Sequence, residues 1–179
     1  MRTATIVLVA YAICIVVASV WRHMPGFTHD AIPAIGALTA AYLGHTTRPH
    51  RVPATAGAVV LGYLVDVISG TPAGMSSLVL AMTADIARAT QQRIFVRGTA
   101  MTVGYSAFIA VFAGVSKIIV SALFGIPRPR FSLEMQHMAL IALATALVGP
   151  LVWRLFRRID AAYARTHRER DAALEGLVP

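Results

Sequence analysis

Six stretches of apolar residues divide the chain, and polar or turn-forming residues separate each stretch from the next. They cover residues 3–20, 30–43, 54–69, 75–89, 98–124 and 138–156. Apolar runs of this kind are typical of helices that lie in lipid. The first, fifth and sixth are long enough to cross a hydrocarbon core of roughly 30 Å, whereas the other three have only about 14–16 residues. We expect those three to be tilted, sheltered by neighbours or re-entrant.

Turn-forming residues support this division of the chain. Pro25 and Gly26 separate the first two segments, and Pro127 and Pro129 separate the last two. There is no long soluble insertion and no clear repeat. The sequence therefore predicts an all-α integral membrane protein with one transmembrane domain, residues 1–156, and a basic tail, residues 157–179. The tail continues the last helix and either lies on anionic lipid or is surrounded by water.

The composition agrees with a membrane protein and disagrees with a soluble one. Apolar residues make up 57% of the 179 residues and charged residues only 13%, against about 45–50% and about 25% in soluble domains. A soluble fold of this size could not bury so much apolar surface. The net charge of +8 does not indicate nucleic-acid binding, because the arginines fall between apolar segments and not on one face of a soluble module.

The distribution of basic residues predicts the orientation of the chain. With six crossings and a cytoplasmic N-terminus, twelve arginines fall in cytoplasmic segments and three in outer loops. Cytoplasmic loops of membrane proteins carry such an excess of Arg and Lys. We therefore expect an even number of crossings, with both termini in the cytoplasm.

Two charged residues lie inside apolar segments. Asp66 is near the outer end of residues 54–69, and Lys117 is about two turns from the outer end of residues 98–124. A carboxylate inside a membrane helix costs roughly 2.5–3.5 kcal/mol at the helix centre and less near the interface, so by default it marks function or a buried pair. One hypothesis is an Asp66–Lys117 ion pair. The other is that Lys117 extends alone to the outer interface.

The surroundings of Asp66 predict a helical hairpin. Ala58, Gly62 and Asp66 recur every four residues and share one helix face, where small residues let a neighbouring helix approach closely. A tight reversal follows at Ser69-Gly70-Thr71-Pro72-Ala73-Gly74. We expect the hydroxyls of Ser69 and Thr71 to satisfy backbone groups at the helix ends.

The remaining polar residues argue against catalysis. Asp85 and Arg88 are placed for a local ion pair on one helix, and Asp85 and Asp66 should lie at opposite ends of neighbouring helices, too far apart to share a proton. No Ser has a nearby His base in the pattern of a hydrolase, and no two His residues have the spacing of a helical zinc site. A single cysteine, Cys14, excludes an internal disulfide. We expect no enzymatic activity, no metal and no cofactor.

The residues before and within the reversal carry a family resemblance. Pro49-His50-Arg51-Val52, followed by Gly62-x-x-x-Asp66-x-x-Ser69-Gly70-Thr71-Pro72-x-Gly74, resembles the pattern of the rod shape-determining protein MreD family. The last segment is similar too, with Ala144-Thr145-Ala146-Leu147-Val148-Gly149-Pro150-Leu151 before a basic exit. The specific part of the resemblance covers residues 49–74.

This resemblance implies a non-enzymatic scaffold of the bacterial inner membrane that helps to maintain rod shape and lateral peptidoglycan synthesis. Its partners would be MreC and, through MreC, the MreB filament, the polymerase RodA and a class B penicillin-binding protein. The implied fold has six helices and is similar to the substrate-binding component of energy-coupling-factor vitamin transporters. A partner-binding or structural hub would comprise Gly62, Asp66, Ser69, Gly70, Pro72 and Gly74. Pro49, His50 and Arg51 would belong to a cytoplasmic basic loop.

The fold similarity leaves a second function open, because fold alone does not decide function. The chain could be the small-molecule binding component of a membrane transporter. Such a site needs polar or aromatic groups that converge on a cavity. The candidates at the outward ends of the segments are Asp66, Ser69, Ser76, Ser77, Tyr105 and Ser116.

Overall fold

The computed structural model describes residues 2–23, 32–46, 51–91, 98–126 and 131–175, and this part of the chain contains helices and no strand. The predicted all-α fold is confirmed. The six helices are α1 (Arg2–Arg22), α2 (Ile35–Thr46), α3 (Arg51–Ser69), α4 (Met75–Gln91), α5 (Thr99–Leu123) and α6 (Phe131–Glu175). Four of them, α1, α3, α5 and α6, are long and apolar enough to cross a membrane.

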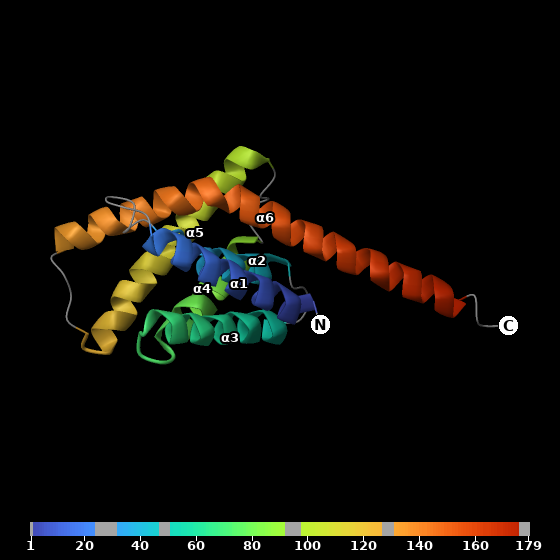
Figure 1. The fold of residues 1–179 in the computed structure, drawn as a ribbon, viewed down its shortest axis with the longest axis horizontal. Coiled ribbons are helices and arrows are strands. Elements are labelled where there is room, and N and C mark those ends of the chain that lie inside the picture. Colours follow the sequence, from blue (N-terminus) through green and yellow to red (C-terminus); the bar gives the residue numbers. More distant parts are fainter. Residues whose placement is uncertain (1, 24–31, 47–50, 92–97, 127–130, 176–179) are drawn as a thin grey trace.

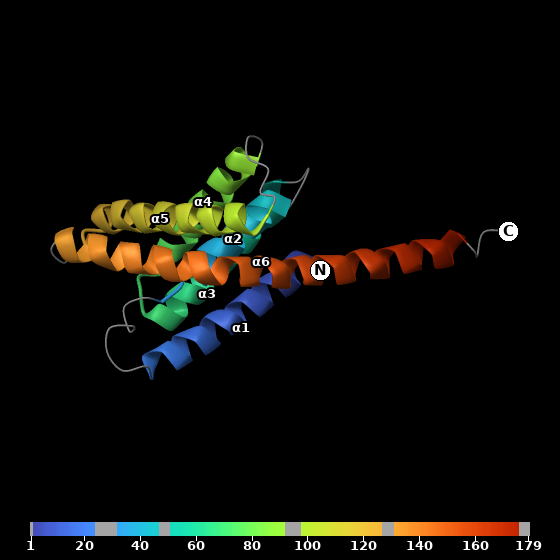
Figure 2. The ribbon, with the colours of Figure 1, turned by 90° about the horizontal axis from the view of Figure 1, so that it is seen from above.

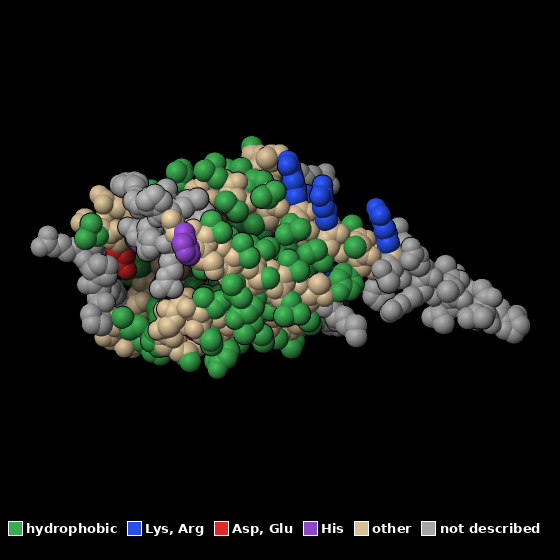
Figure 3. Space-filling view, viewed as in Figure 1, with side chains coloured by type: hydrophobic (Ala, Val, Ile, Leu, Met, Phe, Trp, Pro, Cys, Tyr) green, Lys and Arg blue, Asp and Glu red, His purple; other side chains and the backbone are tan. Residues whose placement is uncertain are grey.

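The helices form a bundle from which only α6 projects (Figure 1). Seen from above, α6 continues well past the ends of the other helices (Figure 2). The N-terminus lies at the end of the bundle where α6 leaves it. We call this the basic end, because the arginines of α6 gather there (Figure 3). The opposite end, where α3 turns into α4, is the turn end.

α3 and α6 are longer than the sequence predicted. The third apolar segment was expected at residues 54–69, as a short segment that is tilted, sheltered or re-entrant, but α3 begins at Arg51 and has 19 residues. Pro53 does not prevent this, because the N–H groups of a first helical turn have no intrahelical partner. α6 has 45 residues and includes Pro150. It runs without interruption through residues 156 and 157, as expected for a tail that continues the last helix, and the division into two domains there stays a prediction.

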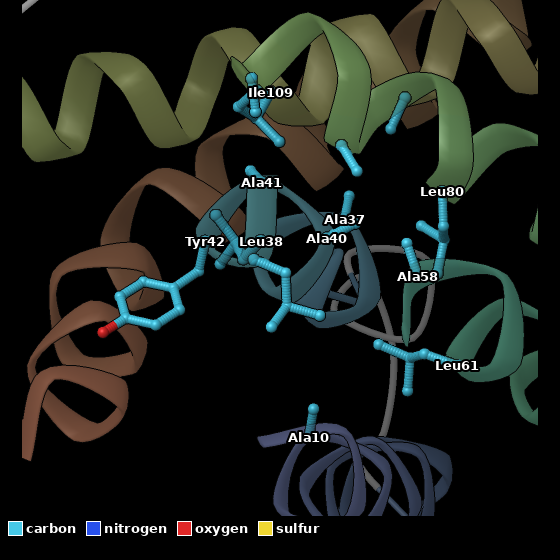
Figure 4. Packing of buried hydrophobic residues seen from close by; sticks show 14 of the residues in the cluster. Ala10, Ala37, Leu38, Ala40, Ala41, Tyr42, Ala58, Leu61, Leu80 and Ile109 are labelled. Carbon is cyan, nitrogen blue, oxygen red and sulfur yellow. The ribbon is translucent and has the colours of Figure 1, made fainter. Parts of the chain in front are cut away.

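α2 is short because it lies inside the protein. Nine of its 12 residues are buried, including Leu38, Tyr42 and Leu43. Figure 4 shows α2 surrounded by Ala10 of α1, Ala58 and Leu61 of α3, Leu80 of α4 and Ile109 of α5. A helix that is apolar all round belongs in a core. Of the three alternatives for the short segments, sheltering by neighbours therefore describes α2.

Glycines let the central helices approach each other at backbone distance. A β-carbon added at Gly44 of α2 would lie 2.2 Å from the carbonyl oxygen of Ala84 in α4. One added at Gly62 of α3 would lie 2.4 Å from the Cα of Ser77 in α4. Small residues at helix contacts are the usual basis of close packing in lipid. α4 is therefore held between α2 and α3, and the predicted small-residue face of α3 is confirmed.

Polar contacts fix the basic end of the bundle. The guanidinium of Arg2 donates two hydrogen bonds to the carboxylate of Asp160, at 2.6 and 2.5 Å. The hydroxyl of Tyr42 donates to the same carboxylate at 2.6 Å. The ring of Tyr42 also packs against Trp153 and Phe156 of α6. These contacts join α1, α2 and α6 where α6 leaves the bundle.

The outside of the bundle is strongly apolar between its two ends. Leu143, Leu147 and Leu151 form a stripe along α6 and are 64%, 73% and 69% exposed. Apolar side chains cover much of the middle of the face in Figure 3, and the arginines stand at one end. Exposed apolar patches of this extent are rare on soluble monomers. The surface agrees with a membrane protein.

We predict that Gly44→Ala destabilises the bundle, because its β-carbon would collide with the backbone of α4. Overpacking costs about 1–3 kcal/mol, and a backbone contact cannot relax by changing a rotamer. The matched control is Gly104→Ala in α5, where nothing lies within 4 Å of the added carbon. Thermal unfolding of the purified protein in detergent checks this. Equal midpoints for the two variants would contradict the close approach.

Candidate functional site

The turn between α3 and α4 is organised around the carboxylate of Asp66, which is only 2% exposed. One oxygen, Oδ1, accepts a hydrogen bond from the hydroxyl of Thr71 at 2.7 Å. The other, Oδ2, accepts one from the backbone N–H of Gly74 at 2.9 Å. The N–H of Ser76 lies 3.0 Å from Oδ1 and 3.2 Å from Oδ2 and is shared between them. Asp66 therefore binds three donors from the turn and the first residues of α4.

Asp66 caps α4 from a neighbouring helix. The first N–H groups of a helix lack intrahelical acceptors, and a carboxylate near that end also interacts favourably with the helix dipole. The first turn of α4 contains no acidic residue of its own. Asp66, near the end of α3 and eight residues before Gly74, supplies the carboxylate instead. The same hydrogen bonds therefore cap α4 and hold the reversal.

Two glycines give the turn its backbone shape. Gly70 has φ +65° and Gly74 has φ +96°, a region that favours glycine because it has no β-carbon. Between them, the carbonyl of Pro72 accepts a hydrogen bond from the N–H of Met75 at 3.2 Å. The reversal predicted at residues 69–74 is confirmed, and it requires glycine at both positions.

The expected roles of the two hydroxyls need correction. The Thr71 hydroxyl donates to the Asp66 side chain and not to a helix-end carbonyl. Ser69 is exposed and has no described bond of that kind. The backbone N–H groups at the start of α4 are satisfied by the carboxylate instead, because an ionised oxygen is a stronger acceptor than a hydroxyl.

α3 and α4 are also joined farther along the hairpin from the turn. The hydroxyl of Ser77 donates to the carbonyl of Val59 at 3.0 Å, beside the contact between Gly62 and the backbone of Ser77. At the other end of α4, Asp85 and Arg88 form the expected local ion pair at 2.9 Å. The hairpin is therefore tied by side chains along the half of its length nearest the turn.

Asp66 and Lys117 do not pair. Within the described residues no ion pair joins them, and the Asp66 carboxylate is occupied by the donors of the turn. Lys117 is exposed and lines a cavity on α5. The hypothesis of a buried pair is therefore wrong. Hydrogen-bond donors of the turn, which follow Asp66 closely in the sequence, occupy its carboxylate instead of Lys117.

A cavity of about 770 Å³ lies at the turn end of the bundle, with walls from all six helices. Most of its lining is apolar, including Val65 and Leu80, and Lys117, Glu134 and His137 add polar groups from α5 and α6. In Figure 3 the acidic and histidine side chains visible on this face gather near that end. The residues that form the turn contribute Ser69, next to Met75 and Ser76 of α4.

Only two of the six residues expected to converge on a ligand line this cavity: Ser69 and Ser76. Asp66 is committed to the turn, Ser77 bonds α3, and Ser116 is buried elsewhere. Tyr105 was placed at the outward end, and this is wrong. Its hydroxyl lies 3.1 Å from that of Thr90, near the end of α4 at the basic end. The error arose because α5 begins at Thr99, so residue 105 lies in its first third.

The predicted basic loop is only partly within the described residues. Pro49 and His50 lie outside them, and Arg51 is the first residue of α3. Among the described residues no three His, Cys, Asp or Glu side chains are grouped so that they could hold a metal ion.

Sequence reasoning missed three features that fix the bundle. The cap by Asp66 had no local signal, because an N-cap residue directly precedes its helix, whereas Asp66 lies within α3. Gly44 had a weak signal, as an isolated glycine inside an apolar segment. The contact between Arg2 and Asp160 had none, because 158 residues separate the two.

We predict that Asp66→Ala lowers the free energy of unfolding by about 3 kcal/mol or more, because hydrogen bonds to charged groups contribute about 1.5–3 kcal/mol each. Asp66→Asn keeps one acceptor oxygen and should cost less. The control is Asp85→Ala, which removes an exposed helix pair worth about 0.3–0.5 kcal/mol. Unfolding in detergent measures all three, and a similar loss for Asp66→Ala and Asp85→Ala would contradict the cap.

A double-mutant cycle tests the separation of Asp66 from Lys117. We predict a coupling energy within about 0.5 kcal/mol of zero for Asp66→Ala and Lys117→Ala, as for residues without shared partners. The same unfolding measurement gives the four free energies. A coupling of about 1 kcal/mol or more would show that the two charges interact after all.

The main polar groups of the turn are bound within the protein. The strongest acceptor, Asp66, binds the protein's own backbone, and Gly62 serves a helix contact. Comparison with known proteins finds no matching family model, no matching curated protein and no matching solved structure.

Proposed function

We propose that this chain is a non-enzymatic scaffold of the bacterial inner membrane, similar to MreD, that serves the cell-elongation complex. It would cross the membrane six times with both termini in the cytoplasm. Its role would be to maintain rod shape and regulate lateral peptidoglycan synthesis by binding MreC and, through it, the MreB filament, RodA and a class B penicillin-binding protein.

The observation that carries this proposal is the use made of the residues that resemble MreD. Gly62 contacts α4, Asp66 caps α4, and Gly70 and Gly74 shape the turn. A catalytic or transport site would leave its polar groups available to a ligand. Here the strongest acceptor, the Asp66 carboxylate, is occupied by internal hydrogen bonds. This is consistent with a protein whose function is to present a fixed shape.

The arrangement of the helices supports the proposed topology. Four helices are long and apolar enough to span, and α2 lies among them with most of its residues buried. Arg2 at the start of α1 contacts Asp160 on α6, so both chain ends leave the bundle on the same side. The arginines of α6 gather there, which favours a cytoplasmic location for that side.

Partner binding would use surfaces that the bundle leaves exposed. The apolar stripes of the long helices can pack against helices of other membrane proteins by shape. At the turn end, Pro72 and Ala73 are exposed beside the Asp66 cap, so the capped hairpin presents them rigidly. We assign the partner contact to Pro72, an exposed member of the predicted hub, and to its neighbour Ala73, and a structural role to Gly62 and Asp66.

The cavity at the turn end favours a second candidate function, the binding of a small molecule for a transporter. Its volume of about 770 Å³ falls within the range of roughly 300–1,000 Å³ of ligand pockets. Its mostly apolar wall with a few polar groups is also typical of such sites. A small molecule that co-purifies with the chain, together with a pair of ATPase subunits, would favour this function over the scaffold.

Co-purification of the full-length chain from bacterial membranes in mild detergent distinguishes the two functions. We expect MreC and a cell-wall synthase among the proteins recovered. We also expect Ala73→Arg, which places a charge on the exposed turn, to lower the recovery of MreC several-fold.

The matched control is Ala161→Arg, at a position on α6 that is also exposed and lies far from the turn. It should leave the recovery of MreC unchanged. Folding of each variant is checked by its elution in detergent. Recovery of ATPase subunits without MreC, from a folded protein, would overturn the scaffold proposal.

A further inference from the structure

A second, smaller cavity lies at the basic end, apart from the turn and the large cavity. It has a volume of about 260 Å³ and is formed where the start of α5 meets α6. Its lining comprises Gly98, Thr99, Thr102, Pro150, Arg154 and Arg157. Among the described residues no acidic side chain lines it, and none of its lining residues lines the large cavity.

The two arginines give this cavity a positive charge that the described protein does not neutralise. Arg154 and Arg157 are three residues apart on α6 and so share a face. Within the described residues neither forms a salt bridge, since Asp160 pairs with Arg2 and Asp85 with Arg88. The Nε of Arg157 donates to the carbonyl of Trp153 at 3.4 Å, which leaves its terminal nitrogens as donors toward a ligand.

The start of α5 adds uncharged donors to the same cavity. Gly98 precedes the helix with φ 90°, no side chain caps the first turn, and that turn has no acidic residue. The hydroxyl of Thr102 is used within the helix, where it donates to the carbonyl of Gly98. The Thr99 hydroxyl and the first backbone N–H groups remain, next to the two guanidinium groups, and such a combination favours an anion.

The location of the cavity relates it to the membrane surface. The exposed apolar stripe of α6 falls from 69% exposure at Leu151 to 38% at Leu155, which lies between Arg154 and Arg157. A group bound between the arginines would therefore lie where the hydrocarbon core gives way to lipid headgroups. An acyl chain attached to that group could lie along the leucine stripe.

We propose that this cavity binds a phosphate group, with Arg154 and Arg157 as its charged ligands and Thr99 and the start of α5 as further donors. The chemistry fits the phosphodiester of an anionic phospholipid and also inorganic phosphate. This inference rests on the membrane topology of the proposed function and is independent of its protein partners.

The test uses the full-length protein, freed of lipid in a nonionic detergent. Three probes are compared by native mass spectrometry and thermal shift: phosphatidylglycerol, diacylglycerol without a phosphate, and sodium phosphate against sodium chloride at equal ionic strength. We expect phosphatidylglycerol to bind and diacylglycerol not to bind. The double variant Arg154→Gln/Arg157→Gln should weaken the binding of phosphatidylglycerol by about tenfold or more, since each basic residue near a membrane surface adds to the affinity for anionic lipid.

Arg158→Gln is the matched control, because Arg158 is the next residue on α6, is exposed and does not line the cavity. It should change binding by less than about twofold. Where the double variant does not elute as a folded protein, Arg154→Gln alone gives the same comparison, since its side chain is exposed.

The outcomes separate the sources of the phosphate. Binding of phosphatidylglycerol alone identifies a lipid site, and a stabilisation by sodium phosphate that the Arg154 and Arg157 variants lose identifies a site for the free anion. Equal weakening by Arg158→Gln, equal binding of diacylglycerol, or no effect of the Arg154 and Arg157 variants would each overturn the proposal. None of these readouts depends on MreC, so a failure here is distinct from a failure of the scaffold function.

Discussion

The carboxylate of Asp66 holds the start of α4 against the end of α3, and the packing of the central helices depends on that contact. It binds Thr71, Gly74 and Ser76, which sets where α4 begins and how it is rotated. With this rotation, the backbone at Ser77 meets Gly62 of α3. The carbonyl of Ala84, further along α4, then meets Gly44 of α2. A change in the cap would therefore disturb the packing of α2 against α4, because backbone contacts this close cannot adjust independently.

The energies explain why a carboxylate is retained in an apolar helix. Placing it there costs roughly 2.5–3.5 kcal/mol or less near an interface. Hydrogen bonds to a charged group contribute about 1.5–3 kcal/mol each, so three donors offset the cost. The same bonds satisfy backbone groups at the start of α4 that lipid could not satisfy. Asp66, the residue that looks most like a functional charge in the sequence, is thus required for the hairpin. The exposed turn beside it is the better candidate for a functional contact.

Much of the fold could be predicted from the sequence, and particular residues show where prediction stops. The apolar segments gave six helices, and the spacing of Ala58, Gly62 and Asp66 gave the face of α3 that meets α4. The start of α3 was predicted at residue 54, directly after Pro53, although a first helical turn tolerates proline. The predicted Asp66–Lys117 pair was wrong because the prediction considered only their opposite charges. Neutral hydrogen-bond donors of the turn lie nearer to Asp66 in the sequence. The contact between Arg2 and Asp160 depends on tertiary packing, which no local pattern encodes.

Amide hydrogen exchange at Gly74 and Ser76, in the full-length protein in detergent, tests the central claim most directly. Both N–H groups donate to the Asp66 carboxylate, whereas residues at the start of an uncapped helix exchange readily because they lack an acceptor. We predict that both amides exchange as slowly as those in the interior of α4. In Asp66→Ala they should lose protection while the interior of α4 keeps it. Exchange at the rate of an open turn in the unmodified protein would show that the carboxylate does not cap α4.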